Sequence, residues 1–281
     1  MDSCVYKIEE IYFDNPIFNS IIDCTYILLC CGENPKRLDS VLKNIKILQP
    51  TKKVKLVYNK GFDSCKFSKS INHDLVNMQT FIFNDSIKNI YDRILYLEDD
   101  FELKEQLNQK DIDNIINLIK LKNPDVYGLG NFSFPKINYI FNKSQKVIGN
   151  FLASSHAIIY SKKYMFKYID FINNDKEQEK LAIDYIPSQI NNIEAYRYYK
   201  PLIYQKFPVT ENQKNGWKNQ MGNFIAIISI FFIKLLRLDK NIEPGYTVLY
   251  IFPYIIYFLL LLLILLIIII IYKRIKISKK I

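Results

Sequence analysis

The chain has 281 residues, 49% of them hydrophobic and 23% charged, which is enough for one large domain or for one domain with an appendage. Its formal net charge is +10, but half of this excess lies after residue 272, where no acidic residue occurs. The rest of the chain is only mildly basic and lacks blocks of Lys and Arg interleaved with aromatic residues, so we expect no nucleic-acid partner.

The cysteines and the first residues bear on the cellular compartment. The five cysteines are Cys4, Cys24, Cys30, Cys31 and Cys65. Their number is odd and their spacing shows neither a disulfide framework nor a zinc motif, so we expect unpaired thiols in a reducing compartment. Charged residues interrupt any apolar run in the first ten positions, so no signal peptide is predicted there.

A strand–helix–strand unit is predicted after an irregular lead-in over residues 1–22. An apolar run over 25–31 predicts a strand, residues 35–48 carry apolar side chains at helical spacing, and 54–58 predicts a second strand. Strands in this order pair in parallel through a right-handed crossover. Arg37 opens the helix, where an open sheet meets a nucleotide, so it is a candidate contact for a diphosphate or a base. A solvated arginine is the alternative interpretation.

The stretch that organises the chain is a short apolar run, residues 94–97, followed by Glu98, Asp99 and Asp100. Its length and branching predict a buried strand, and ligands of open α/β sheets bind at the carboxyl ends of strands. Three adjacent carboxylates repel one another unless a cation lies among them, and their oxygens suit Mg²⁺ or Mn²⁺ bound together with substrate phosphates. The sequence therefore predicts a metal–diphosphate site here, with a solvated acidic turn as the alternative.

Later segments complete the α/β pattern and add two candidate residues. A helix is predicted over 111–121, and a strand over 125–130 contains two glycines, which indicate close approach of another backbone. His156 stands at the entry of a strand over 157–160, where it is either a ligand of a metal or phosphate or a structural histidine. Asp184 is the only carboxylate in an apolar segment; a semi-buried carboxylate has a raised pKa and can act as a general base, and a helix cap is the alternative.

Taken in chain order, these motifs resemble glycosyltransferase family 25, a group of GT-A-type enzymes related to lipopolysaccharide and collagen sugar transferases. The resemblance spans roughly residues 25–217 and rests on the acidic motif, the 156–161 strand, Asp184 and the segment 199–205. It implies a GT-A-like (Rossmann-like) α/β fold with a mostly parallel sheet flanked by helices. Where the family has an arginine-rich start after its first strand, this chain offers only Arg37.

The resemblance also implies roles for individual residues. It implies metal binding by four side chains: Glu98, Asp99, Asp100 and His156. It implies donor binding by three: Arg37, Asp99 and Gln205. The metal would be Mn²⁺ or Mg²⁺, and the donor a nucleotide-diphosphate sugar such as a UDP-sugar. Asp184 would deprotonate a hydroxyl of a glycan, protein or lipid-linked acceptor in one inverting displacement, and the segment 208–217 would form the acceptor side, with Trp217 stacking on a sugar.

The C-terminal part predicts a membrane anchor. Residues 246–272 carry no charge and would form a helix of about 40 Å, longer than a hydrocarbon core of about 30 Å. The chain then divides into a GT-A-like domain (1–221), an interfacial or re-entrant helix and turn (222–245), the transmembrane helix (246–272) and a basic tail (273–281). The lipid bilayer is thus an expected partner, and the lack of an export signal favours a domain that faces the cytosol.

Two other function classes fit the same pattern. One is a non-catalytic, membrane-tethered binding or scaffold protein on a decayed transferase fold. The other is a sugar-phosphate nucleotidyltransferase, which would carry a Gly-rich, basic phosphate loop after the first strand. The sequence around Gly32 is a poor match to such a loop.

Overall fold

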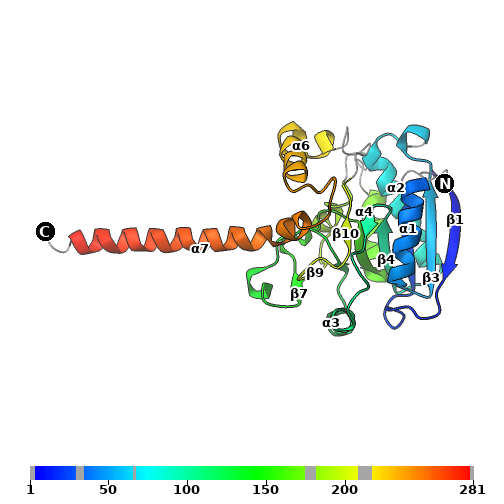
Figure 1. Cartoon of the computed structure of the whole chain (residues 1–281), viewed down its shortest axis with the longest axis horizontal. Helices are drawn as coiled ribbons and strands as arrows, with labels where there is room; N and C mark the ends of the chain where they lie inside the picture. Colours follow the sequence, from blue (N-terminus) through cyan, green and yellow to red (C-terminus); the bar gives the residue numbers. More distant parts are fainter. Residues whose placement is uncertain (1–3, 30–34, 66–67, 175–181, 208–216, 279–281) are drawn as a thin grey trace.

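The computed structural model describes residues 4–29, 35–65, 68–174, 182–207 and 217–278. Within them, helices cover both faces of a central sheet, and a single long helix projects from one end of the domain (Figure 1). Along the sheet the strand order is β1-β3-β2-β4-β8-β6-β9-β7. Its strands are β1 (Val5–Tyr12), β2 (Cys24–Leu29), β3 (Lys53–Asn59), β4 (Arg93–Glu98), β6 (Val126–Gly128), β7 (Ser144–Lys146), β8 (Ala157–Ser161) and β9 (Ala195–Tyr198).

The first half of the sheet is the predicted crossover unit. β2 pairs in parallel with both β3 and β4, and α1 (Pro35–Leu48) connects β2 to β3. All six residues of β2 are buried, as the apolar run in the sequence indicates, because both faces of the sheet are covered by helices. The carboxyl ends of β2 and β4 therefore lie at the same edge of the sheet.

Each face of the sheet has its own apolar core. On one face, α1 and α3 (Gln109–Lys122) pack through residues such as Val41, Ile45 and Ile115. On the other, α2 (Ile71–Lys88) and α4 (Lys162–Asn174) enclose an aromatic cluster in which the Phe83 ring lies 4.8 Å from that of Tyr168. The amphipathic helix spacing seen in the sequence thus places each helix on the sheet.

The second half of the sheet departs from the expected mostly parallel arrangement. β8 is antiparallel to both β4 and β6, and β7 is antiparallel to β9, whereas β6 and β9 are parallel. The α/β class is confirmed, and the sheet is mixed. Because β8 runs against β4, its amino end, next to His156, reaches the same edge as Glu98, whose backbone N–H donates to the His156 carbonyl at 3.0 Å.

The lead-in expected to be irregular is in fact an edge strand. β1 pairs antiparallel with β3 along most of its length. Its side chains are largely exposed and include Lys7, Glu9 and Glu10, so it lacks the apolar run by which buried strands are recognised. Charged side chains of this kind protect a sheet edge from pairing with other chains.

The cysteine spacing predicts no disulfide, but the structure contains one. Cys4, just before β1, forms a disulfide with Cys65, and the two Cα atoms are 5.6 Å apart. The bond ties the edge strand to the segment before α2. A separation of 61 residues carries no sequence signature, because the two segments are near each other only once β1 pairs with β3, with Val5 opposite Asn59. Cys24 is free and buried, while Cys30 and Cys31 lie outside the described residues.

A second, two-stranded sheet lies just beyond the acidic strand. β5 (Phe101–Glu102) pairs antiparallel with β10 (Tyr204–Gln205), and Gln205 is opposite Phe101. In addition, the backbone N–H of Lys206 donates to the Asp100 carbonyl at 2.8 Å. These main-chain bonds bring segments a hundred residues apart in sequence to one place.

Two helices follow at the C-terminus. α6 (Trp217–Leu235) lies beside the start of α7 (Gly245–Ser278), which projects away from the domain (Figure 1). Residues Gly245–Lys273 of α7 are long and apolar enough to cross a membrane, with a mean hydropathy of 3.5 in their most apolar window, none of which is buried. Among the described residues, this is the only helix that meets both criteria.

The chain passes close to itself at Gly130, as its glycine-containing strand predicts. A Cβ atom at this position would lie 1.7 Å from the Ile203 carbonyl oxygen and 2.9 Å from His156 Nε2. We expect Gly130→Ala to lower the free energy of unfolding of the full chain in detergent by about 1–3 kcal/mol or more, because backbone must move. Gly149→Asn is the matched control, since a Cβ there meets nothing within 4 Å and Asn tolerates its φ of +61°. Equal stability of the two variants, measured by thermal unfolding, would contradict the close approach.

Candidate active site

The predicted acidic cluster lies at the carboxyl end of β4, next to the start of α1. The Arg37 guanidinium, in the first turn of α1, contacts Asp99 with Nη1 2.7 Å from Oδ1. Both side chains are largely buried. This pair follows from the topology: β2 and β4 are parallel neighbours, so the residues that follow them meet at one edge. The structure therefore brings together two residues predicted to bind the donor.

The two carboxylate oxygens of Asp100 differ: one accepts a hydrogen bond, and the other has no hydrogen-bond partner among the described residues. Gln205 Nε2 donates to Asp100 Oδ2 at 3.0 Å, which joins a third predicted donor-binding residue to the cluster. Asp100 Oδ1 is buried and has no hydrogen-bond partner among the described residues. Burial, together with the charge of Asp99, raises the pKa of Asp100 to about 7. A buried carboxylate oxygen without a donor is costly, so this atom is suited to bind a cation.

Glu98 and Asp184 form the other side of the cluster. Burial raises the pKa of Glu98 well above its usual range, and the charges of Asp100, Asp184 and Asp99 add to the effect. The influence of Asp184 on Glu98 places these two carboxylates, 86 positions apart, in one electrostatic environment. Repulsion of this kind among four carboxylates favours either protonation or a bound cation.

Asp184 is oriented by the segment that leads into β8. It accepts hydrogen bonds from the backbone N–H groups of Ser154, at 3.2 Å, and Ser155, at 3.0 Å, and from the Ser155 hydroxyl. Burial raises the pKa of Asp184, and these three donors act in the opposite direction. The carboxylate is thus held rigidly, which is what a general base needs, and it does not cap a helix.

His156 is placed at the site but is not available to a ligand. Its ring is fully buried, with Nδ1 2.9 Å from the Ser154 carbonyl oxygen and Nε2 2.9 Å from that of Ile203. Burial lowers its pKa to about 4, whereas the two carbonyl oxygens act in the opposite direction, because only the protonated ring can donate to both. Because both ring nitrogens face main-chain oxygens, we leave His156 out of the metal site and assign it a structural role.

The carboxylates do not form a closed metal cage. Among the described residues, the only three candidate ligand atoms within 4.8 Å of one another belong to Cys4, Cys65 and Asp74, and the two thiols there form the disulfide. An open arrangement fits Mg²⁺ or Mn²⁺, which are commonly held by one or two carboxylates plus the phosphates of a substrate. The free Oδ1 of Asp100 is the residue atom that best fits such an ion.

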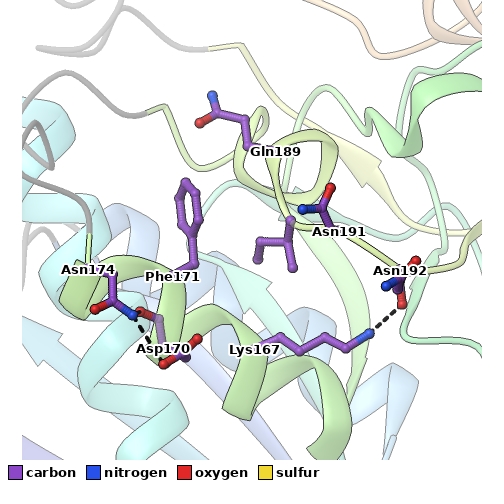
Figure 2. A pocket seen from close by; sticks show the side chains of 8 residues that line it. Lys167, Asp170, Phe171, Asn174, Gln189, Asn191 and Asn192 are labelled. Carbon is purple, nitrogen blue, oxygen red and sulfur yellow. Dashed lines mark hydrogen bonds between the residues drawn. The ribbon is translucent and has the colours of Figure 1, made fainter.

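A pocket lies away from the acidic cluster. It measures about 610 Å³ and lies between α4 and the segment after the short helix α5 (Ile186–Gln189). Figure 2 shows Phe171 pointing toward Gln189 across it, and Lys167 Nζ reaching the main-chain oxygen of Asn192. None of the predicted site residues lines this pocket, so it is separate from the acidic cluster.

Two features of the site escape sequence reasoning. One is the pair of serines at 154–155, whose backbone donors have no signature in side-chain chemistry. The other is Tyr246, in the first turn of α7: its hydroxyl donates to the Gly130 carbonyl at 2.8 Å and lies 3.4 Å from His156 Nε2. Trp217 begins α6, and the rest of the predicted acceptor segment, 208–216, lies outside the described residues.

Comparisons with known proteins give no family assignment. No protein-family model and no curated protein sequence matches the chain, so the resemblance to glycosyltransferase family 25 has no family-level support. Similar solved structures include A197 from STIV (12% identity over 67% of this chain and 87% of that one, TM-score 0.39). Others are a glycosyltransferase involved in the glycosylation of the major capsid of PBCV-1 (13%, 63% and 82%, 0.35) and a mannose-1-phosphate geranyltransferase from Thermus thermophilus (9%, 63% and 73%, 0.35). All three TM-scores are below 0.5.

The raised pKa of Asp100 predicts that Mn²⁺ binding depends on pH. Below about pH 7 the metal must displace a proton from Asp100, so its affinity should fall by about tenfold per pH unit between about pH 7 and pH 5. Calorimetric titration of the full chain in detergent with Mn²⁺ measures this slope. Asp100→Asn should abolish binding, and Asp113→Asn, which changes an exposed carboxylate on α3, should leave it unchanged. An affinity that does not vary over this range would contradict the assignment.

Proposed function

We propose that this chain is a membrane-anchored, metal-dependent glycosyltransferase that moves a sugar from a nucleotide-diphosphate sugar to an acceptor hydroxyl. The observation that carries the proposal is that two unlike carboxylates, Asp100 and Asp184, both act on Glu98 at the end of β4. Asp100 has a buried oxygen without a donor, and Asp184 is held by three donors close to Glu98. One suits a cation, and the other suits the transfer of a proton.

Donor binding would use the edge formed by α1, β4 and β10. The metal, Mn²⁺ or Mg²⁺, would be held by Asp100 with Glu98 or Asp99 and would neutralise charge on the leaving diphosphate. Arg37 lies on Asp99 and can turn to a phosphate or a base with a modest change of its side chain. Gln205 holds Asp100 in place through its amide. A UDP-sugar is the donor we favour.

The reaction would be a single inverting displacement. Asp184 takes the proton of the acceptor hydroxyl, and the acceptor oxygen forms a bond to the anomeric carbon of the sugar. The bond from that carbon to the diphosphate oxygen breaks, and its electron pair leaves with the nucleoside diphosphate. The raised pKa of Asp184 brings this carboxylate closer to the pKa that general-base catalysis at neutral pH requires.

The orientation we propose for the domain is opposite to the cytosolic one expected from the N-terminal sequence. The Cys4–Cys65 disulfide favours an oxidising compartment, because thiols in the cytosol are kept reduced. Basic residues after α7's apolar part favour a cytosolic tail, and one crossing then places the domain on the other side.

The activity is tested by metal-dependent turnover of nucleotide sugars. A panel of nucleotide sugars is incubated with the full chain in detergent and Mn²⁺, and release of nucleoside diphosphate is measured. Asp184→Asn should reduce turnover by about 10²–10⁴-fold with Mn²⁺ affinity retained, since a general base contributes on this scale. Asp100→Asn should lose both, and Asp113→Asn should lose neither. Turnover that survives Asp100→Asn or Asp184→Asn would overturn the site, and nucleotide-sugar binding without any turnover would favour a scaffold role.

The orientation is tested by protease protection in sealed microsomes that contain the full chain with an epitope on each terminus. We expect protease added outside to remove the C-terminal epitope and to leave the domain intact. Detergent should expose the domain, which serves as the control for sealing. Digestion of the domain in sealed microsomes would restore the cytosolic orientation.

A further inference from the structure

Two exposed apolar patches lie on either side of the first turns of α7 (residues 245–250), which we call the root of α7. The first is the outer face of α6, where Ile227, Phe231 and Leu235 are 61%, 59% and 60% exposed. The second is the β7 segment, defined here as residues 134–148, in which Ile137 is 68% and Phe141 is 95% exposed. Exposed apolar groups gathered in this way, rather than scattered singly, mark a surface that binds something.

The α6 face has the form of an interfacial helix. Ile227, Phe231 and Leu235 are spaced four residues apart and therefore lie on one side of the helix. Ala226 and Ile233 lie on the opposite side and are buried, with Ile233 in the small core that surrounds the first turns of α7. The outer face thus has no partner among the described residues, although the inner face is packed.

The β7 segment is held against α7 further along that helix. The Tyr257 hydroxyl donates to the Pro135 carbonyl at 2.7 Å, and the rings of Phe134 and Tyr257 are 6.2 Å apart. In Figure 1, α6 lies on one side of α7 and β7 on the other, both at the end of the domain from which α7 emerges. The elements that carry the two patches are therefore both at the end of the domain from which α7 projects.

The length of α7 favours a position in which this end of the domain enters the bilayer interface. The last contact between the domain and α7 is at Tyr257, and the first charged residue after it is Lys273. The apolar helix between them has about 15 residues and spans about 22 Å, which is about 8 Å less than the hydrocarbon core. Interfacial helices sink about 5–10 Å into the boundary between headgroups and acyl chains, so the missing length equals the depth at which such apolar faces bind.

Charge at the rim of both patches fits lipid headgroups. Exposed basic side chains accompany the apolar ones at the end of α6 and in the β7 segment. They are Lys234, Arg237 and Lys240 in the first case and Lys136 and Lys143 in the second. Cations at this depth can pair with the phosphate groups that lipid headgroups carry.

We propose that the α6 face and the β7 segment form one lipid-binding surface, which seats this end of the domain in the bilayer interface on both sides of α7. The inference rests on the membrane anchor of the proposed function and adds a second, peripheral mode of attachment. It also fixes the site relative to the membrane: Tyr246, at the root of α7, packs 5.2 Å from the ring of Tyr204, the neighbour of Gln205. The acidic cluster is then held directly behind the lipid surface.

The surface is tested by depth-dependent fluorescence quenching of the full chain in nanodiscs that contain phosphatidylcholine and phosphatidylglycerol brominated on their acyl chains. Trp217, the only tryptophan, is replaced by Phe, and single probes are introduced as Phe141→Trp and Phe231→Trp. We expect each to lose about half of its fluorescence in brominated relative to unbrominated lipid, as groups at the acyl boundary do. Ile137→Trp and Leu235→Trp serve as second probes on the same two patches if either first variant fails to fold.

Two further probes give the controls. Tyr12→Trp, on β1 at the far end of the domain, should show no quenching (Figure 1). Phe258→Trp, just beyond the last contact of α7 with the domain, should be quenched. If Phe258→Trp is quenched while the patch probes behave as Tyr12→Trp does, the lipid-binding surface is overturned and the anchor stands. If Phe258→Trp is not quenched, the anchor itself falls, and neither result bears on turnover by the acidic cluster.

Discussion

Mutual repulsion among carboxylates is the constraint around which this structure is arranged. Glu98, Asp99 and Asp100 follow one another at the carboxyl end of β4. Asp184, from a distant loop, lies near enough to raise the pKa of Glu98. Burial removes the water that would screen them, so Asp99 raises the pKa of Asp100, and the other three carboxylates raise that of Glu98. Arg37 offsets one of these charges, and a cation at Asp100 would offset another. A fold that tolerates this cost without a functional reason would be unusual.

The supports of the cluster come from main-chain pairing more than from side chains. The two-stranded sheet of β5 and β10 places Gln205 next to Asp100. The segment that leads into β8 supplies the N–H groups that bind Asp184. The His156 ring lies between these segments, with Nδ1 2.9 Å from the Ser154 carbonyl oxygen and Nε2 2.9 Å from that of Ile203. Elements with extensive main-chain bonding are rigid, which is the property that a catalytic constellation needs.

The first turns of α7 connect the acidic cluster to the long apolar part of that helix. Tyr246 touches Gly130 and His156, and Tyr254 and Tyr257 continue the contact along the same helix. Arg197, fully buried in β9, donates to the Tyr254 hydroxyl at 3.0 Å and lies over the ring of Tyr250. A helix bound in this way cannot swing freely on a linker, so α7 and the acidic cluster keep a fixed relation.

The amino-acid sequence predicts correctly the elements that carry strong local signals. The apolar runs of β2, β4 and β8 and the helical spacing in α1 and α3 gave the correct positions, and the α/β class follows from their order. The acidic motif, Arg37 and Gln205 were identified as residue types and are close together in the structure. The exposed edge strand β1 was missed because pairing at an edge requires no apolar run.

The partners of these residues depend on the tertiary structure. The direction of β8, the pairing of Cys4 with Cys65 and the capture of Asp184 by Ser155 all depend on contacts between segments far apart in the chain. The same holds for His156, whose sequence position suggested a ligand but whose two nitrogens are engaged by carbonyls from separate loops. Local sequence specifies the conformation and chemistry of a residue, whereas its partners depend on where the rest of the chain packs, and no local pattern encodes that.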